Sequence, residues 1–179
     1  MSSNLRPQVP ARRRDAIEEY QQAATDKSDA DRRKEVRKRK RGAVRACPEC
    51  HAFSQRKRWR YDPDVFATLG EIESTLCPGC KRLADKRVDG YVELRGASLG
   101  KRAEEVRNLI DHVVAEARRN DPVHRLASFV ILDERIVLET TSAWLAETIG
   151  KAVARRFHGE LRLRFTPGED FVRVYWLES

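Results

Sequence analysis

The chain has no hydrophobic run that approaches the roughly 20 residues of a membrane span, and no apolar segment near its N-terminus of the kind that forms a signal peptide. We therefore expect a soluble, cytoplasmic protein whose cysteines stay reduced. A phosphate-binding Gly-x-x-x-x-Gly-Lys-Ser/Thr loop is also missing, and the four histidines are scattered. The sequence therefore predicts a protein that is not an enzyme, although its many carboxylates leave a nuclease as an alternative.

Hydrophobic residues are scarce relative to charged ones. Of the 179 residues, 40% are hydrophobic and 36% are charged, which indicates that part of the chain lacks a core. The length suits one medium domain or two small ones. The net charge of +8 favours a polyanionic partner, either nucleic acid or an anionic membrane surface, and of these we predict nucleic acid and no membrane.

Four cysteines form two pairs of equal spacing, and the chain has no others. They read Cys47-Pro48-Glu49-Cys50 and Cys77-Pro78-Gly79-Cys80, with residues 51–76 between them. Two Cys-x-x-Cys pairs supply four thiolates, which complete the tetrahedral shell of one structural Zn²⁺ ion. Because no position is left for water, we expect the ion to hold structure rather than to catalyse a reaction.

Other uses of the cysteines remain open. A single Cys-x-x-Cys pair can be a redox dithiol, and two disulfides suit a secreted protein. Two pairs without a βαβ context or a signal peptide favour the metal. His51 is able to replace a thiolate, but four cysteines already fill the shell, so we interpret it as a bystander. Iron also binds four thiolates.

Residues 1–46 read as a basic, largely disordered N-terminal extension, with a possible short helix over 14–26. Its most basic stretch, 32–41, has eight cations and one acid, so that it repels itself and stays disordered alone. We predict that this stretch clamps RNA phosphates; a solubilising or targeting tail is the alternative. The RNA-binding residues predicted here are Arg32, Arg33, Lys34, Arg37, Lys38, Arg39, Lys40 and Arg41.

Residues 47–89 form the predicted zinc module. The stretch 51–62 reads as two short strands around a basic turn, followed by a helix that Asp62 caps and Pro63 opens. Val65, Leu69 and Ile72 continue that helix in the pattern. So small a module depends on its metal for stability. Basic and aromatic side chains alternate in the turn and predict an RNA-binding finger made of Arg56, Lys57, Arg58, Trp59 and Arg60.

Residues 90–179 carry the clearest periodicity. We predict a strand over 91–95, a helix over 99–119, a hairpin over 127–141, a helix over 143–157 capped by Ser142 and stopped by Gly159, and a hairpin over 160–177. This order predicts an α+β sandwich of the split βαβ type with both helices on one sheet face.

The open face of that sheet has its own composition. Alternation turns Leu161, Leu163 and Phe165 inward with Val172, Val174 and Trp176. It turns arginines and aromatics outward, namely Arg95, Arg162, Arg164, Phe171, Arg173 and Tyr175. Such a mixture suits phosphate contacts and base stacking, but it is also common on solvated sheet faces. The Gly-Phe signature of RNA-recognition motifs is absent from the strands.

The cysteine module together with the later stretch VILDERIVLETTSAWLAETIGKAVARRFHGELRLRF resembles the zinc-binding adaptor family that escorts large ribosomal subunits from the nucleus, including its shorter prokaryotic relatives. The resemblance covers about 47–176. It implies binding to the ribosome, to large-subunit rRNA and to ribosomal proteins. Long family members have more cysteines and a later domain, which this chain does not show.

We therefore predict a non-enzymatic, zinc-stabilised, rRNA-binding protein of the prokaryotic type that acts in ribosome assembly, dormancy or quality control. A zinc-ribbon transcription regulator that binds DNA is the alternative, although no helix-turn-helix pattern supports it. A further alternative is an adaptor that binds proteins and whose basic tail only keeps it soluble or targets it.

Overall fold

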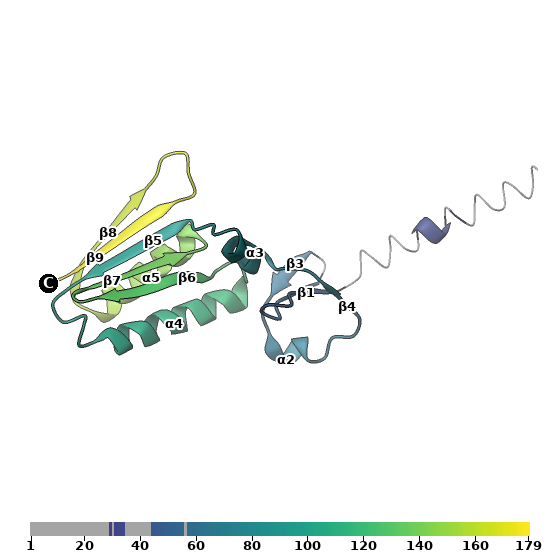
Figure 1. Ribbon diagram of the computed structural model, residues 1–179, viewed down its shortest axis with the longest axis horizontal. Coiled ribbons are helices and arrows are strands. Elements are labelled where there is room, and N and C mark those ends of the chain that lie inside the picture. Colours follow the sequence, from purple (N-terminus) through teal and green to yellow (C-terminus); the bar gives the residue numbers. More distant parts are fainter. Residues whose placement is uncertain (1–28, 30, 35–43, 56) are drawn as a thin grey trace, which may run out of the picture. The chain divides into compact units, whose positions relative to one another are not determined.

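The computed structural model describes residues 29, 31–34, 44–55 and 57–179 (Figure 1). The chain divides into two units, 1–43 and 44–179. In the first unit, Asp29 and residues 31–34 are helical, and Lys34 Nζ lies 3.6 Å from Asp31 Oδ1 on an exposed surface. The predicted helix over 14–26 lies outside the described residues. So does most of the extension for which we predicted disorder.

The cysteine module contains a small four-stranded sheet of β1 (Val44–Ala46), β2 (Phe53–Gln55), β3 (Arg58–Arg60) and β4 (Ile72–Ser74) in the order β3-β2-β1-β4. Strands β1, β2 and β3 are antiparallel, and β4 runs parallel to β1. The two strands around a basic turn that the sequence predicted are β2 and β3. The sheet begins at Val44, three residues before the first cysteine, because β1 pairs on both sides.

The helices of the module are short. Asp62 caps α2 (Pro63–Phe66), since its carboxylate accepts hydrogen bonds from the amides of Asp64 and Val65. The cap is as predicted, but the helix does not continue to Ile72. It ends at Phe66, and Ile72 instead starts β4, where it pairs with β1. The other helix, α3 (Pro78–Ala84), begins in the second cysteine pair.

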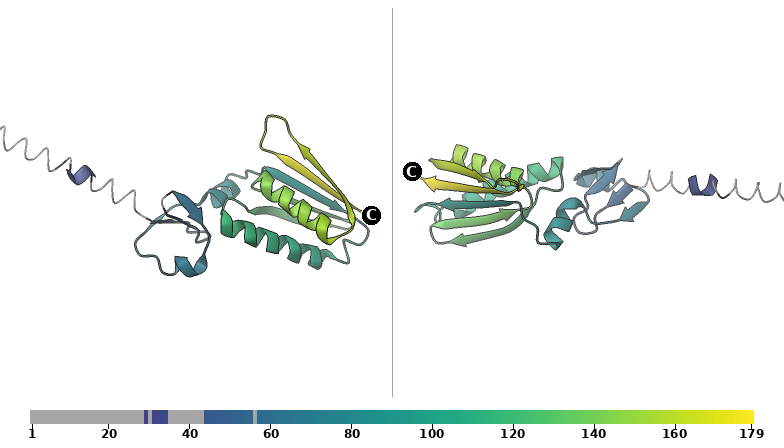
Figure 2. Two further views of the ribbon diagram at one scale, coloured as in Figure 1. Left: turned by 180° about the vertical axis from the view of Figure 1, so that it is seen from behind. Right: turned by 90° about the horizontal axis from the view of Figure 1, so that it is seen from above.

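The rest of the chain forms a mixed five-stranded sheet covered by two helices. Its elements are β5 (Gly90–Arg95), α4 (Ala103–Asn120), β6 (Leu126–Leu132), β7 (Arg135–Thr140), α5 (Ala143–Arg156), β8 (Gly159–Phe165) and β9 (Val172–Glu178). The strand order is β6-β7-β5-β9-β8, with β5 parallel to β9 and the other neighbours antiparallel. Strand β7 thus separates β5 from β6, as in a split βαβ unit. Figure 2 shows α4 and α5 on the same face of the sheet.

The core lies between the helices and the inward positions of the central strands. Val92 and Leu94 of β5 and Val174 of β9 are fully buried there. Helix α4 contributes Val106 and Ile110, and α5 contributes Leu145, Ile149 and Val153. Burial of this apolar surface is the main force that holds the domain together. Among the described residues, no helix has the length and apolar character needed to cross a membrane.

Three details differ from the sequence predictions. Helix α4 begins at Ala103, although Leu99 before it is still buried. Gly159 does not stop α5: the helix ends at Arg156, and Gly159 opens β8, where a Cβ would lie 2.6 Å from the Trp176 ring. Phe165 does not join the core, because it ends β8 at the sheet edge with its side chain 63% exposed.

Candidate metal centre

The structure brings together the four cysteines that the sequence predicted. Their sulfur atoms all lie within 4.8 Å of one another, and Cys50 Sγ is 3.5 Å from Cys77 Sγ. Cys47 and Cys77 are buried, whereas Cys50 and Cys80 are half-buried. The sulfurs of both pairs therefore surround one common point.

The two pairs reach this point through different local structures. The first pair lies in a tight turn between β1 and β2, closed by hydrogen bonds from Cys47 N to Ala52 O and from His51 N to Cys47 O. His51 has a φ of 61°, the left-handed conformation that lets the chain reverse. In the second pair, Cys77 is the N-cap of α3, and its sulfur accepts a hydrogen bond from Cys80 N at 3.4 Å. A tight turn thus positions the sulfurs of the first pair, and the start of a helix positions those of the second.

The sulfurs strongly influence one another's acidity. The pKa of Cys50 falls to about 4, chiefly because the Cys77 thiol donates a hydrogen bond to its sulfur. The pKa of Cys77 is raised for the converse reason, because that hydrogen bond favours its protonated form. Burial raises the pKa of Cys80 to about 11. One thiolate is thus favoured within the group, and a bound cation would favour deprotonation of the other sulfurs.

An arginine from the α+β domain completes the surroundings of the sulfurs. Arg125, just before β6, is 7% exposed and places Nη2 2.7 Å from Cys50 Sγ, 3.8 Å from Cys80 Sγ and 3.9 Å from Cys77 Sγ. Burial alone would lower the pKa of its guanidinium, but the combined effect of Cys50, Cys77 and Cys80 outweighs burial and raises that pKa. Arg125 is therefore a fixed cation beside the thiolates.

Backbone contacts fix Arg125 in place. Its amide donates to Thr141 Oγ1 at 2.9 Å, and its carbonyl accepts from Thr141 N at 3.0 Å. Gly79 in α3 allows the close approach, since a Cβ there would lie 2.0 Å from the Pro122 carbonyl oxygen and 3.0 Å from Arg125 Cγ. The second cysteine pair thus packs directly on the loop between α4 and β6.

A second arginine joins the first cysteine pair to helix α4. Arg118 Nη2 donates to the Cys50 carbonyl at 3.1 Å, and its guanidinium lies 3.7 Å from the centre of the Tyr61 ring. The cation–π contact and the hydrogen bond hold the module against α4. Sequence reasoning missed both Arg118 and Arg125, because nothing in their neighbourhoods distinguishes them from other arginines on a polar helix and loop.

The donor set fits a metal ion. Four ligands about 2.3 Å from a tetrahedral ion lie about 3.8 Å from one another, close to the spacing of these sulfurs. Four thiolates around a divalent cation carry a net charge of −2, which Arg125 partly offsets. Cys47, Cys50, Cys77 and Cys80 can therefore hold a metal ion.

No family model, curated protein or solved structure matches this chain.

His51 does not belong to the cluster. Its ring stacks on Phe66, with the ring centres 5.0 Å apart, and it is exposed. The four sulfurs instead share one site, unlike two separate disulfides, and all four cysteines are free. This geometry favours a metal ion over the disulfide alternative.

The predicted RNA-binding residues divide into four groups. Lys57, Arg58 and Arg60 are exposed on the β2–β3 hairpin, whose turn is formed by Lys57 at a φ of 72°. Trp59 is half-buried and packs against the cysteine cluster, so that its ring supports the module. Arg32, Arg33 and Lys34 are exposed on the first unit. The remaining ones, Arg37, Lys38, Arg39, Lys40, Arg41 and Arg56, lie outside the described residues.

One catalytic sequence pattern occurs away from the cysteines. Gly96-Ala97-Ser98-Leu99-Gly100 matches the Gly-x-Ser-x-Gly elbow of serine hydrolases and links β5 to α4. Ser98 lacks the strained left-handed backbone of such an elbow. Its hydroxyl and its amide both donate to the Glu178 carboxylate, and none of the hydrogen bonds in the described part of the chain joins it to a histidine. Ser98 thus fastens the end of β9 rather than forming a nucleophile–base pair.

Proposed function

We propose that the protein is a non-enzymatic, zinc-stabilised RNA-binding protein that acts on the ribosome. The observation that carries this proposal is the β2–β3 hairpin, which presents Lys57, Arg58 and Arg60 to solvent. Within the described residues, none of these three cations has a carboxylate oxygen within 4.0 Å. Such cations on an exposed hairpin suit contacts to phosphates.

Zinc is the metal that we propose for the cluster. Four cysteine ligands are typical of structural Zn²⁺ sites, in which no ligand position is left for a substrate. The buried residues of the module beside the cysteines are few, so that the ion would supply much of the stability of residues 44–84. In this account the metal acts on RNA only indirectly, by holding the basic hairpin in shape.

The ribosome is proposed as the source of the RNA on two grounds. The net charge of +8 suits a large polyanion, and the resemblance to the ribosomal adaptor family points to large-subunit rRNA in the cytoplasm. The basic stretch 32–41 would add phosphate contacts of its own. A role in assembly, dormancy or quality control fits each of these features.

A binding experiment tests the proposal. The full chain, loaded with zinc, is titrated into a fluorescently labelled fragment of large-subunit rRNA, with duplex DNA of equal length as the competitor. We expect rRNA to bind more tightly than the DNA, and we expect affinity to fall steeply with salt because counterions are released. The variant Lys57→Gln/Arg58→Gln/Arg60→Gln should weaken binding by about tenfold or more.

The matched control removes the same charge elsewhere. Lys101→Gln/Arg119→Gln/Arg155→Gln changes three exposed cations on the helix side of the α+β domain. It should bind rRNA much better than the hairpin variant. An equal loss of rRNA affinity in the two variants would mean that the hairpin contributes only through its net charge. Tighter binding to duplex DNA than to rRNA would favour a transcription regulator.

A further inference from the structure

The face of the five-stranded sheet that the helices leave uncovered carries a regular arrangement of side chains. The strand registers place them in rows across the sheet. One row contains Arg135, Arg95, Leu177 and Glu160; the next contains Val137, Glu93, Tyr175 and Arg162; the third contains Glu139, Tyr91, Arg173 and Arg164. Arginines lie at both ends of this face, and the two tyrosines lie in its middle.

Two pairs of arginines lie directly opposite each other on neighbouring strands. Arg95 of β5 faces Arg135 of β7, and Arg164 of β8 faces Arg173 of β9. Like charges in directly opposed positions destabilise a sheet. Their occurrence twice on the same face indicates a requirement other than stability, and negative charge beside each pair would relieve the repulsion.

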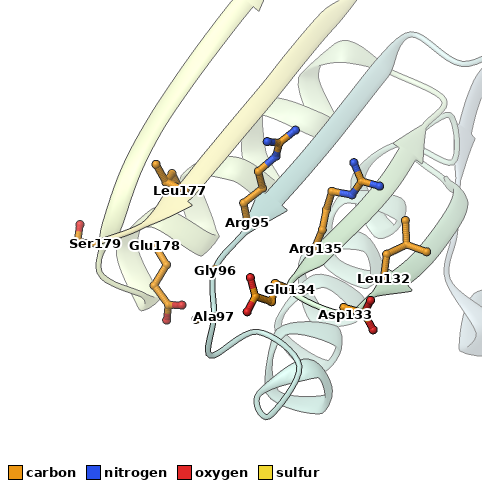
Figure 3. Close-up of a pocket in the computed structure, with 10 residues that line it drawn as sticks. All are labelled: Arg95, Gly96, Ala97, Leu132, Asp133, Glu134, Arg135, Leu177, Glu178 and Ser179. Carbon is orange, nitrogen blue, oxygen red and sulfur yellow. The ribbon is translucent and has the colours of Figure 1, made fainter.

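The first pair is held by a buried carboxylate. Glu93 is 5% exposed, and its Oε1 lies 2.7 Å from Arg95 Nε and 3.6 Å from Arg135 Nη1. The Tyr91 hydroxyl donates to its other oxygen at 3.1 Å. Figure 3 shows the two guanidinium groups side by side and pointing the same way from adjacent strands. One carboxylate thus orients two guanidiniums while leaving outward N–H groups of Arg95 free for a phosphate.

The second pair has no such acid. In the described part of the chain, no carboxylate oxygen lies within 4.0 Å of Arg164 or Arg173. Arg173 Nη1 donates to Thr166 Oγ1 at 3.1 Å, and its guanidinium lies 4.8 Å from the centre of the Phe171 ring. Neutral neighbours position this pair and leave its charge uncompensated.

An aromatic platform lies between the two pairs. The rings of Tyr175 and Tyr91 are 6.4 Å apart, and the Arg164 guanidinium lies 5.8 Å from the Tyr175 ring centre. A depression of about 430 Å³ is lined here by three arginines, by the carboxylates of Glu93 and Glu160, of which Glu160 pairs with Arg162, and by Tyr175, Trp176 and Leu177. Since strand residues rise about 3.4 Å each and strands lie about 4.8 Å apart, the two arginine pairs are about 14 Å apart along the strands and about 10 Å across them.

We propose that this open face binds single-stranded RNA, with phosphates at the Arg95–Arg135 and Arg164–Arg173 pairs and a base stacked on Tyr175 between them. The inference rests on the proposed RNA-binding function and assigns to it a second surface, separate from the β2–β3 hairpin. Charge complementarity selects the occupant, because paired guanidiniums match phosphates. The half-buried Tyr175 ring distinguishes a single strand from a duplex, because the bases of a duplex are stacked on one another and cannot stack on a protein side chain.

The test uses the zinc-loaded full chain and two probes, a fluorescently labelled single-stranded oligoribonucleotide of mixed sequence and an RNA duplex of the same length. The variants are Arg164→Gln/Arg173→Gln and Tyr175→Leu. Each should weaken single-strand binding by about tenfold. The arginine variant should also reduce the dependence of log affinity on log salt concentration by about 0.7 for each phosphate that the protein no longer binds, whereas Tyr175→Leu should leave that dependence unchanged.

The matched control is Arg119→Gln/Arg155→Gln, which removes the same charge from the exposed surfaces of α4 and α5. It should bind the single strand nearly as well as the wild type. If the wild type binds RNA but the sheet variants behave like this control, the inference is overturned and the proposed function stands. If the sheet variants lose duplex and single-strand binding equally, the face is a general anion surface and the single-strand claim is overturned. If the wild type binds neither probe, the proposed function itself fails.

Discussion

Two residues, Arg125 and Gly79, determine how the candidate metal centre packs against the rest of residues 44–179. Arg125 places a buried cation against three of the four sulfurs, and Gly79 lets α3 approach the loop that carries Arg125. Substitution of Gly79 would displace the loop that carries Arg125, and substitution of Arg125 would remove a cation from the cysteine sulfurs. Both therefore connect metal binding to the packing of the α+β domain.

Replacing Arg125 by glutamine should weaken metal binding. The variant removes the charge that offsets the four thiolates, and residues that support metal ligands in this way typically account for about 10–100-fold in affinity. Competition for zinc against a coloured chelator measures the effect. Arg119→Gln, which removes an exposed cation from the nearby end of α4, serves as the control. Equal zinc affinities for the two variants would contradict the role of Arg125.

Adding a methyl group at Gly79 should destabilise the protein. An alanine Cβ there would meet the Pro122 carbonyl oxygen at 2.0 Å, which forces backbone movement, and overpacking of this kind costs about 1–3 kcal/mol. Gly70→Ala is the matched control, because nothing lies within 4 Å of a Cβ at that position. Thermal unfolding should show a lower midpoint for Gly79→Ala only. Similar midpoints would mean that α3 is not tightly packed on this loop.

At the scale of secondary-structure elements, local signals were the most reliable predictors. The Asp62 and Ser142 caps, the two C-terminal hairpins and the inward alternation of Val172, Val174 and Trp176 are all visible in the sequence, because each depends on neighbouring residues. The extent of α2 was not predictable, since Ile72 is taken into β4 by pairing with β1, which lies far back along the chain. The prediction for Gly159 was wrong because a glycine that follows a helix can either end it or permit close packing, here against Trp176, and the sequence does not distinguish the two.

Helix α5 offers a test of one such local signal. Ser142 Oγ accepts a hydrogen bond from Leu145 N at 3.3 Å and lies 2.8 Å from His124 Nδ1. Ser142→Ala removes this cap and should lower the free energy of unfolding by about 1 kcal/mol, whereas Ser142→Asp, which keeps an acceptor, should lose much less. Urea unfolding monitored by tryptophan fluorescence gives both values. No difference between the two variants would show that the cap contributes nothing.

On the scale of the whole molecule, residues 44–179 contain two separate hydrophobic clusters. One surrounds the cysteines and is small, whereas the other fills the α+β domain and includes none of the cysteines. The four-cysteine cluster was predictable because two Cys-x-x-Cys pairs can be recognised in the sequence itself. The arginines that cover it were not, because they come from a different domain, well beyond the last cysteine in the chain.

Removal of the metal should therefore affect the two clusters differently. A strong chelator should abolish amide protection from hydrogen exchange in β1, β2 and α3, because the proposed ion would supply much of the stability of that module. Strands β5 and β9 and helix α5 should stay protected, since their core is complete without it. Hydrogen-exchange mass spectrometry with and without the chelator measures this. Uniform loss of protection, or none, would contradict the division.

Sedimentation of cell extract through a sucrose gradient at low and high salt tests whether this protein binds ribosomal RNA. We expect the wild type to migrate with the large subunit or whole ribosomes at low salt and to leave them at high salt. The Lys57→Gln/Arg58→Gln/Arg60→Gln variant, which keeps all four cysteines, should move toward the top of the gradient. If the wild type remains at the top at both salt concentrations, the protein is not a ribosome-binding factor.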